Sequence, residues 1–123
     1  MAIQKILIIE DSHFVCTVLE DGLRTSGFEV ITVHDGKEGL RRARKDLPAL
    51  IILDLILPGL PGEEVCRQLK KDSLTEKIPV IMLTGRDSDA DRVLGRVLGA
   101  DAYILKPFDL KNVVDTISTL IHI

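Results

Sequence analysis

The sequence has few aromatic residues, few cysteines and no excess of positive charge. Aromatic side chains make up 3% of its 123 residues, and tryptophan is absent. The two cysteines, Cys16 and Cys66, are too few for a disulfide scaffold and lack zinc-type spacing. We therefore expect both to be reduced and buried, on opposite faces of a sheet. A formal net charge of −3 disfavours nucleic acid and anionic membranes as direct partners.

No long hydrophobic segment is present. The opening stretch MAIQKILIIED has one lysine and a short apolar run that ends in two acids, unlike a signal peptide or a membrane span. We therefore expect a cytoplasmic protein. With 46% hydrophobic and 28% charged residues, and no linker or internal repeat, the composition predicts one globular domain over residues 1–123.

Five short apolar runs predict strands, and helical patterns fill the spaces between them. The strands are expected at 6–9, 30–33, 50–53, 80–83 and 103–105. The helical stripes are Val15, Val18 and Leu19; Leu40, Ala43 and Leu47; Val65, Cys66 and Leu69; Ala90, Val93, Leu94, Val97 and Leu98; and Leu110, Val113, Val114, Ile117, Leu120 and Ile121. This alternation predicts a doubly wound parallel α/β domain.

The fourth expected helix, at about 89–98, differs from the others. It carries Gly95 in its interior, which costs roughly 1 kcal/mol relative to alanine. We expect this helix to be the weakest of the five.

Polar residues follow four of the expected strands: Glu10, Asp11, Asp54, Thr84 and Lys106. Ligands of open α/β sheets bind beyond the carboxyl ends of the strands. Each residue also has an ordinary local interpretation. Asp11 or Ser12 could cap the first helix, and Asp54 could begin the Pro-Gly turn that follows it.

If these side chains converge, their charges require a cation. Two carboxylates roughly 5 Å apart repel by about 3 kcal/mol at an effective dielectric constant near 20. Lys106 supplies one positive charge, and a cluster of carboxylate oxygens is the ligand set that Mg²⁺ prefers. Metal and lysine together would stabilise a phosphoryl group, with Asp54 as a carboxylate nucleophile.

The stretches ILIIEDS, DLILPGLPGEEV, PVIMLTG and GADAYILKPFD, in this order and at this spacing, resemble the receiver domain of bacterial two-component response regulators. The resemblance covers essentially the whole chain. It implies a (βα)5 flavodoxin-like receiver fold with a five-stranded parallel sheet in the order 2-1-3-4-5. It also implies a phosphoacceptor signalling domain rather than an enzyme.

The resemblance assigns a role to each polar residue at the strand ends. Asp54 corresponds to the phosphoacceptor, which takes its phosphoryl group from a phosphohistidine of a sensor histidine kinase or histidine phosphotransfer protein. Thr84 and Lys106 correspond to residues that bind the phosphoryl oxygens, and the Lys106–Pro107 bond to one that is usually cis. The corresponding Mg²⁺ ligands are Glu10, Asp11, Asp54 and the backbone carbonyl of Ile56.

The resemblance also implies a switch. Thr84 moves toward the phosphoryl group, and Tyr103 turns inward. The face of the fourth helix, fifth strand and fifth helix then changes for a downstream protein or output domain, and a phosphorylation-dependent homodimer is possible in this family. Core packing explains Tyr103 equally well. Ala102 stands where a second acid is common, and Arg86 and Ile56 occupy positions that tune dephosphorylation.

The sequence argues against two other classes of protein. A flavodoxin-like electron carrier would need a phosphate-binding loop where this sequence has EDSHF, and an aspartate-based phosphatase would need an acid at Ile56. The receiver could be a phosphorelay intermediate or a docking module that is never phosphorylated.

His13, His34 and His122 share no ligand spacing; His13 lies near the acidic pair but otherwise reads as a first-turn helix residue. A basic cluster, Arg41, Arg42, Arg44 and Lys45, reads as a solvated helix face.

Overall fold

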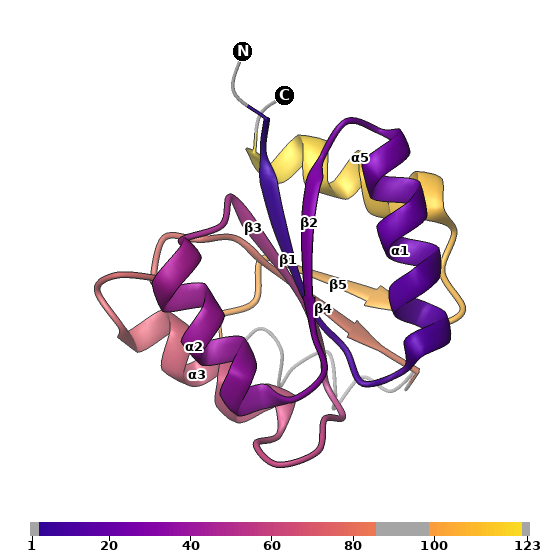
Figure 1. Ribbon diagram of the computed structural model, residues 1–123. Coiled ribbons are helices and arrows are strands. Elements are labelled where there is room, and N and C mark those ends of the chain that lie inside the picture. Colours follow the sequence, from indigo (N-terminus) through magenta and orange to yellow (C-terminus); the bar gives the residue numbers. More distant parts are fainter. Residues whose placement is uncertain (1–2, 86–98, 122–123) are drawn as a thin grey trace.

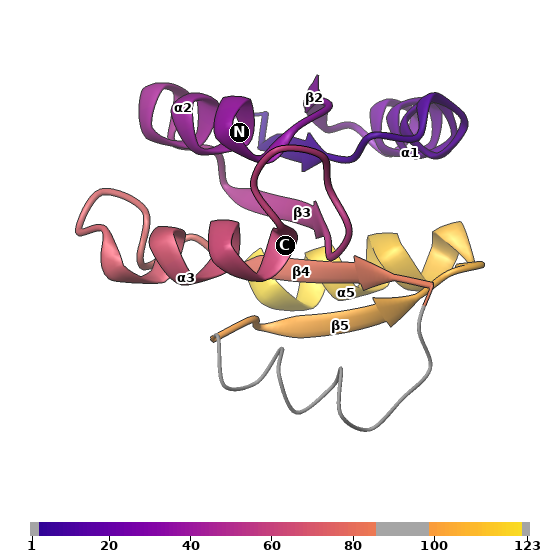
Figure 2. The ribbon, with the colours of Figure 1, turned by 90° about the horizontal axis from the view of Figure 1, so that it is seen from below.

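The computed structural model describes residues 3–85 and 99–121, and the described residues include a five-stranded parallel sheet. The strands are β1 (Lys5–Ile9), β2 (Glu29–Val33), β3 (Leu50–Asp54), β4 (Val80–Thr84) and β5 (Ala102–Leu105). Their order is β2-β1-β3-β4-β5, so the predicted fold class is confirmed. All neighbours run parallel, and their carboxyl ends therefore share one edge of the sheet (Figure 2).

Helices cover both faces of the sheet. The described helices are α1 (His13–Thr25), α2 (Gly36–Asp46), α3 (Gly62–Lys71) and α5 (Leu110–Ile121). Figure 1 shows α1 and α5 on one face and α2 and α3 on the other. The helix expected at about 89–98, with Gly95, lies outside the described residues.

The sheet separates two apolar cores. The side chains of β3 point alternately into the two, and all five of its residues are buried, because each face is covered by helices. Cys66 of α3 belongs to one core, whereas Cys16 lies on α1 over the other face. The two cysteines thus lie on opposite faces of the sheet, as predicted, and both are buried and form no disulfide.

The sequence pattern placed two apolar side chains wrongly. In α1 the fully buried stripe is Cys16, Leu19 and Leu23, and Val18 is 36% exposed. Leu47 is 52% exposed, because α2 ends at Asp46 and Leu47 has a left-handed backbone, with φ of 45°, as the C-cap. The apolar stripes therefore predicted both helices correctly, but not the exposure of Val18 or the residue at which α2 ends.

The longest of the described helices, α1, has 13 residues. Among the described residues, no helix is both long enough and apolar enough to cross a bilayer.

Candidate functional site

Three carboxylates converge at the carboxyl edge of the sheet. Glu10 and Asp11 follow β1 and Asp54 ends β3; these strands pair directly, with Ile9 opposite Leu53. One carboxylate oxygen from each residue lies within 4.8 Å of the other two. Glu10 and Asp54 are buried and Asp11 is exposed, so the cluster opens to solvent on the Asp11 side.

One lysine reaches this cluster. Lys106 Nζ lies 2.6 Å from Glu10 Oε1 and 3.2 Å from Asp54 Oδ2. Burial and the neighbouring Asp54 carboxyl raise the pKa of Glu10. Burial alone would lower the pKa of Lys106, but the two carboxylates outweigh it and raise that pKa. Three carboxylates and one ammonium leave a formal charge of −2.

The N-terminus of α1 shows whether Asp11 caps this helix or belongs to the carboxylate cluster. Ser12 caps the helix, since its hydroxyl accepts a hydrogen bond from the Val15 amide at 3.3 Å. The Ser12 amide in turn donates to Glu10 Oε2 at 3.1 Å. Asp11 is therefore not the cap, and its carboxylate belongs to the cluster.

Asp54 takes part both in the turn after β3 and in the carboxylate cluster. Its Oδ1 accepts a hydrogen bond from the Ile56 amide at 3.2 Å, while Oδ2 faces Lys106. The loop that follows is closed by the Gly62 amide, which donates to the Leu55 carbonyl at 3.0 Å. A Cβ atom on Gly62 would lie 2.1 Å from the Asp54 carbonyl oxygen, so only glycine allows this approach.

Thr84 and Lys106 come from the two strands beyond β3. Thr84 ends β4, where the preceding residue, Leu83, lies opposite Asp54, and it is buried. The Lys106 amide donates to the Thr84 carbonyl at 2.6 Å, which fixes the chain next to the lysine. The Lys106–Pro107 bond is cis, the geometry that the family resemblance implied. The structure thus brings Glu10, Asp11, Asp54, Thr84 and Lys106 to one edge.

The donor set fits a hard divalent cation. Oxygen ligands without nitrogen or sulfur suit Mg²⁺. Glu10 Oε1 is buried and, apart from its ion pair with Lys106, has no aligned hydrogen-bond donor among the described residues. The Lys106 ammonium already faces this oxygen, but one positive charge does not balance three carboxylates, and the remaining negative charge favours a further cation. The Ile56 carbonyl remains a predicted ligand.

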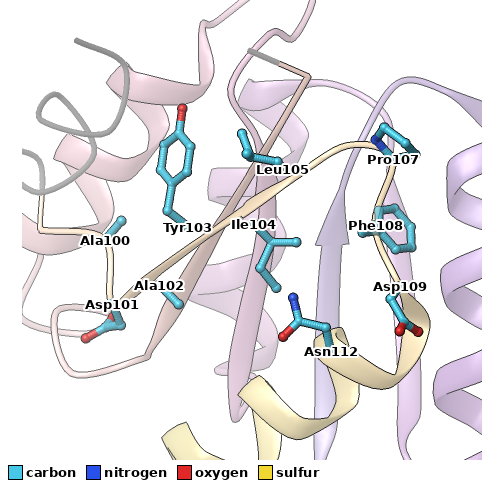
Figure 3. A pocket seen from close by; sticks show the side chains of 10 residues that line it. All are labelled: Ala100, Asp101, Ala102, Tyr103, Ile104, Leu105, Pro107, Phe108, Asp109 and Asn112. Carbon is cyan, nitrogen blue, oxygen red and sulfur yellow. The ribbon is translucent and has the colours of Figure 1, made fainter. Parts of the chain in front are cut away.

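Tyr103 lies on the edge strand. Its side chain and that of Leu105 point to one side of β5, and Ile104 points to the other (Figure 3). A groove of about 630 Å³ runs along β5 to the start of α5 and is lined in part by Tyr103, Phe108 and Asn112. Tyr103 is half-buried and packs against the core on the α2 and α3 side. Arg86 lies outside the described residues.

Sequence reasoning missed two neighbours of the cluster. His34 Nδ1 lies 3.1 Å from the Glu10 carbonyl oxygen, and the Cys16 thiol donates to the same oxygen at 3.3 Å. His34 follows β2, so the rule that selected the other strand ends also applies to it. Its ring centroid is 4.6 Å from that of His13, although the spacing of the histidines gave no indication of a pair.

The basic cluster on α2 consists of surface charges. Arg41 pairs with Glu38, and Arg44 lies 2.7 Å from Asp72 beyond α3. These ion pairs are partly solvated and agree with a solvated helix face.

The amino-acid sequence resembles known signalling proteins. The family model described as response regulator receiver domain matches residues 6–118. The alkaline phosphatase synthesis transcriptional regulatory protein PhoP of Bacillus subtilis is 46% identical over 110 residues, which are 89% of this chain and 45% of PhoP. The phosphate regulon transcriptional regulatory protein PhoB of Rhizobium meliloti is 39% identical, over 96% of this chain and 52% of PhoB. The chain thus spans about half the length of these relatives.

Solved structures agree. A putative response regulator from Chloroflexus aurantiacus superposes with a TM-score of 0.95 at 31% identity, covering 99% of this chain and 100% of that one. The receiver domain of a sensor histidine kinase from Pseudomonas aeruginosa superposes with a TM-score of 0.92 at 30% identity, again over 99% and 100% of the two chains. That structure has a magnesium ion coordinated in its active-site cleft.

Proposed function

This chain belongs to the response regulator receiver domain family, and we propose that residues 1–123 form one receiver domain that accepts a phosphoryl group on Asp54. The donor is a phosphohistidine of a sensor histidine kinase or a histidine phosphotransfer protein. The transfer requires Mg²⁺ and takes place in the cytoplasm.

The convergence of three carboxylates on one lysine carries this proposal. Lys106 holds Glu10 and Asp54 together, but its single charge cannot neutralise the cluster. The remaining negative charge and the oxygen donors support a Mg²⁺ ion held by Glu10, Asp11 and Asp54.

In the transfer, Asp54 is the nucleophile. A carboxylate oxygen of Asp54 forms a bond to phosphorus while the phosphorus–nitrogen bond of the donor breaks, and the imidazole nitrogen keeps the electron pair. Asp54 Oδ1 is held by the Ile56 amide, which leaves Oδ2, beside Lys106, as the oxygen that faces the donor. Lys106 then stabilises charge on the transferred oxygens, and the Thr84 hydroxyl binds one of them. When bound, Mg²⁺ would neutralise the negative charge of the phosphoryl oxygens.

The output face includes β5 and α5. We propose that Thr84 moves toward the phosphoryl group and that Tyr103, whose strand neighbours β4, turns inward. This changes the surface along β5 and the start of α5, where the groove of about 630 Å³ lies. The partner is a downstream protein, an output domain or a second copy of the chain.

Phosphorylation can be tested with a small phosphodonor and Mg²⁺. Intact mass spectrometry should show the addition of one phosphoryl group to the wild type. Asp54→Asn should show none, whereas Asp115→Asn, an exposed carboxylate of α5, should react like the wild type. A wild type that gains no mass would refute the assignment and favour a docking role. An Asp54→Asn variant that gains as much as the wild type would refute Asp54 as the phosphoacceptor and point to another residue.

A further inference from the structure

Two histidines meet at the surface beside the carboxylate cluster. His13 begins α1 and His34 follows β2, and both side chains are exposed. Their ring centroids are 4.6 Å apart and the ring planes are tilted by 50°. Neither ring takes part in the phosphoryl chemistry proposed above.

The backbone holds His34 in place. β1 and β2 pair in register up to Ile9 and Val33, and the Glu10 amide donates to the Val33 carbonyl at 3.0 Å. The His34 ring then returns to the Glu10 carbonyl, with Nδ1 at 3.1 Å. Because a carbonyl oxygen only accepts, Nδ1 donates the hydrogen bond in this contact, which leaves Nε2 as the ring nitrogen available to a ligand. This is the second-shell arrangement that orients metal-binding histidines.

His13 is available as a second ligand. Within the ranges 3–85 and 99–121, its ring has no hydrogen-bond partner and contacts His34. Two imidazoles bound side by side to one ion, with metal–nitrogen distances of about 2.1 Å, have ring centroids roughly 4.5–5.5 Å apart. The observed separation of 4.6 Å falls within that range.

We propose that His13 and His34 bind a borderline divalent transition-metal ion, of the Ni²⁺ and Zn²⁺ class, at a second site next to the Mg²⁺ ligands. The imidazole nitrogens select this class, whereas the carboxylate cluster selects a hard ion. Water completes the coordination. The nearby Cys16 thiol is not a ligand in this proposal, because it is buried and donates a hydrogen bond to the Glu10 carbonyl oxygen.

A calorimetric titration of the full chain with Ni²⁺, carried out in saturating Mg²⁺, tests this site. Mg²⁺ occupies the carboxylate cluster, so the remaining binding reports on the histidines. We expect one Ni²⁺ per chain, and an affinity at least about tenfold weaker in both His13→Asn and His34→Asn. His122→Asn, which removes the third histidine, and Asp115→Asn, which removes an exposed carboxylate of α5, should bind Ni²⁺ like the wild type.

Two results would overturn the proposal. One is the loss of Ni²⁺ binding when Mg²⁺ saturates the protein, which would assign the ion to the carboxylates. The other is equal Ni²⁺ affinity in His34→Asn and His122→Asn. Thermal unfolding of each variant without metal verifies that the substitutions leave the fold intact. In NMR spectra, Ni²⁺ should broaden the ring signals of His13 and His34 more than those of His122.

Discussion

Both edges of the sheet carry a lysine paired with an aspartate, but the two networks differ in completeness. At the amino edge, Lys70 Nζ donates to the Ile78 carbonyl at 2.8 Å and to Asp101 Oδ2 at 3.1 Å. Asp101 also accepts the Val80 amide at 2.8 Å, so one positive and one negative charge are matched. At the carboxyl edge, Lys106 faces Glu10 and Asp54, with Asp11 alongside, and negative charge remains.

The Lys70–Asp101 network is a structural ion pair, whereas the cluster around Lys106 has unbalanced charge that a ligand could neutralise. The amino-edge network ties the end of α3 to the starts of β4 and β5 through backbone groups. In the carboxyl-edge cluster, Lys106 alone faces the buried Glu10 Oε1 and Asp54 Oδ2, so one ammonium serves three carboxylates in the described part of the chain. A matched pair stabilises the fold, whereas an unmatched cluster keeps binding capacity for a ligand.

Exchange of each lysine for methionine should give the largest contrast. Lys106→Met removes the ammonium that faces Glu10 and Asp54 and that we propose binds the phosphoryl oxygens, and we expect phosphorylation by a small donor to slow by about 10²-fold or more. Lys70→Met should leave that rate unchanged while lowering the free energy of unfolding by about 1 kcal/mol. Rates from intact mass and urea unfolding measure the two effects. Equal phosphorylation rates in both variants would contradict the distinction between the Lys106 cluster and the Lys70 network.

Mg²⁺ should stabilise only the carboxyl edge. At about a hundredfold excess over its dissociation constant, a bound ion adds about 2.7 kcal/mol, which corresponds to a rise of several degrees in Tm. Asp11→Ala should lose most of this rise, because it removes one of the three proposed Mg²⁺ ligands. Asp11 is exposed, so the substitution leaves the core unchanged. Asp101→Asn should retain it. A full rise in Asp11→Ala would remove Asp11 from the metal site.

Neutralising one aspartate at each edge should have opposite effects on stability without Mg²⁺. Asp54→Asn relieves repulsion from Glu10 and Asp11 but also loses attraction to Lys106, and we expect a net gain of about 1 kcal/mol. Asp101→Asn should lower stability by about 1 kcal/mol, because its partners are satisfied and partly buried. Urea unfolding in the presence of a chelator measures both. Destabilisation by Asp54→Asn would show that Lys106 already balances the cluster.

The two thiols report on the two edges, with the smallest expected effect. Burial raises the pKa of both to about 11; Glu10 adds to this at Cys16, whereas Lys70 and Asp101 oppose one another at Cys66. Mg²⁺ next to Glu10 favours the thiolate, so it should lower the Cys16 pKa by a few tenths and leave the Cys66 pKa unchanged. Thiolate absorbance in variants that retain a single cysteine measures this. Equal shifts at both would indicate a global change.

The sheet and the convergent edge could be predicted because their signals are local or follow from topology. Continuous apolar runs identified β3 and β4, and parallel strands bring their ends together whatever the loops do. The last turn of α2 could not be predicted, because the orientation of Leu47 depends on a left-handed cap that leucine rarely adopts.

The contacts within the edge were less accessible to sequence reasoning. Whether Asp11 or Ser12 caps α1 depends on a difference of one residue in where the helix begins, which an apolar pattern does not define. The His13–His34 pair joins residues from different elements, and only the strand register brings the two together. Side-chain direction was therefore the missing information, rather than the position of the backbone.

The loop after Asp54 has a consequence for mutational tolerance. Gly62 has no side chain that could take part in the chemistry, and deletion of side-chain atoms cannot probe it. Yet one added methyl group would occupy the space of the Asp54 carbonyl oxygen and push against Leu55. In a saturation library selected for signalling, position 62 should be about as restricted as Asp54, the proposed phosphoacceptor, through excluded volume rather than charge.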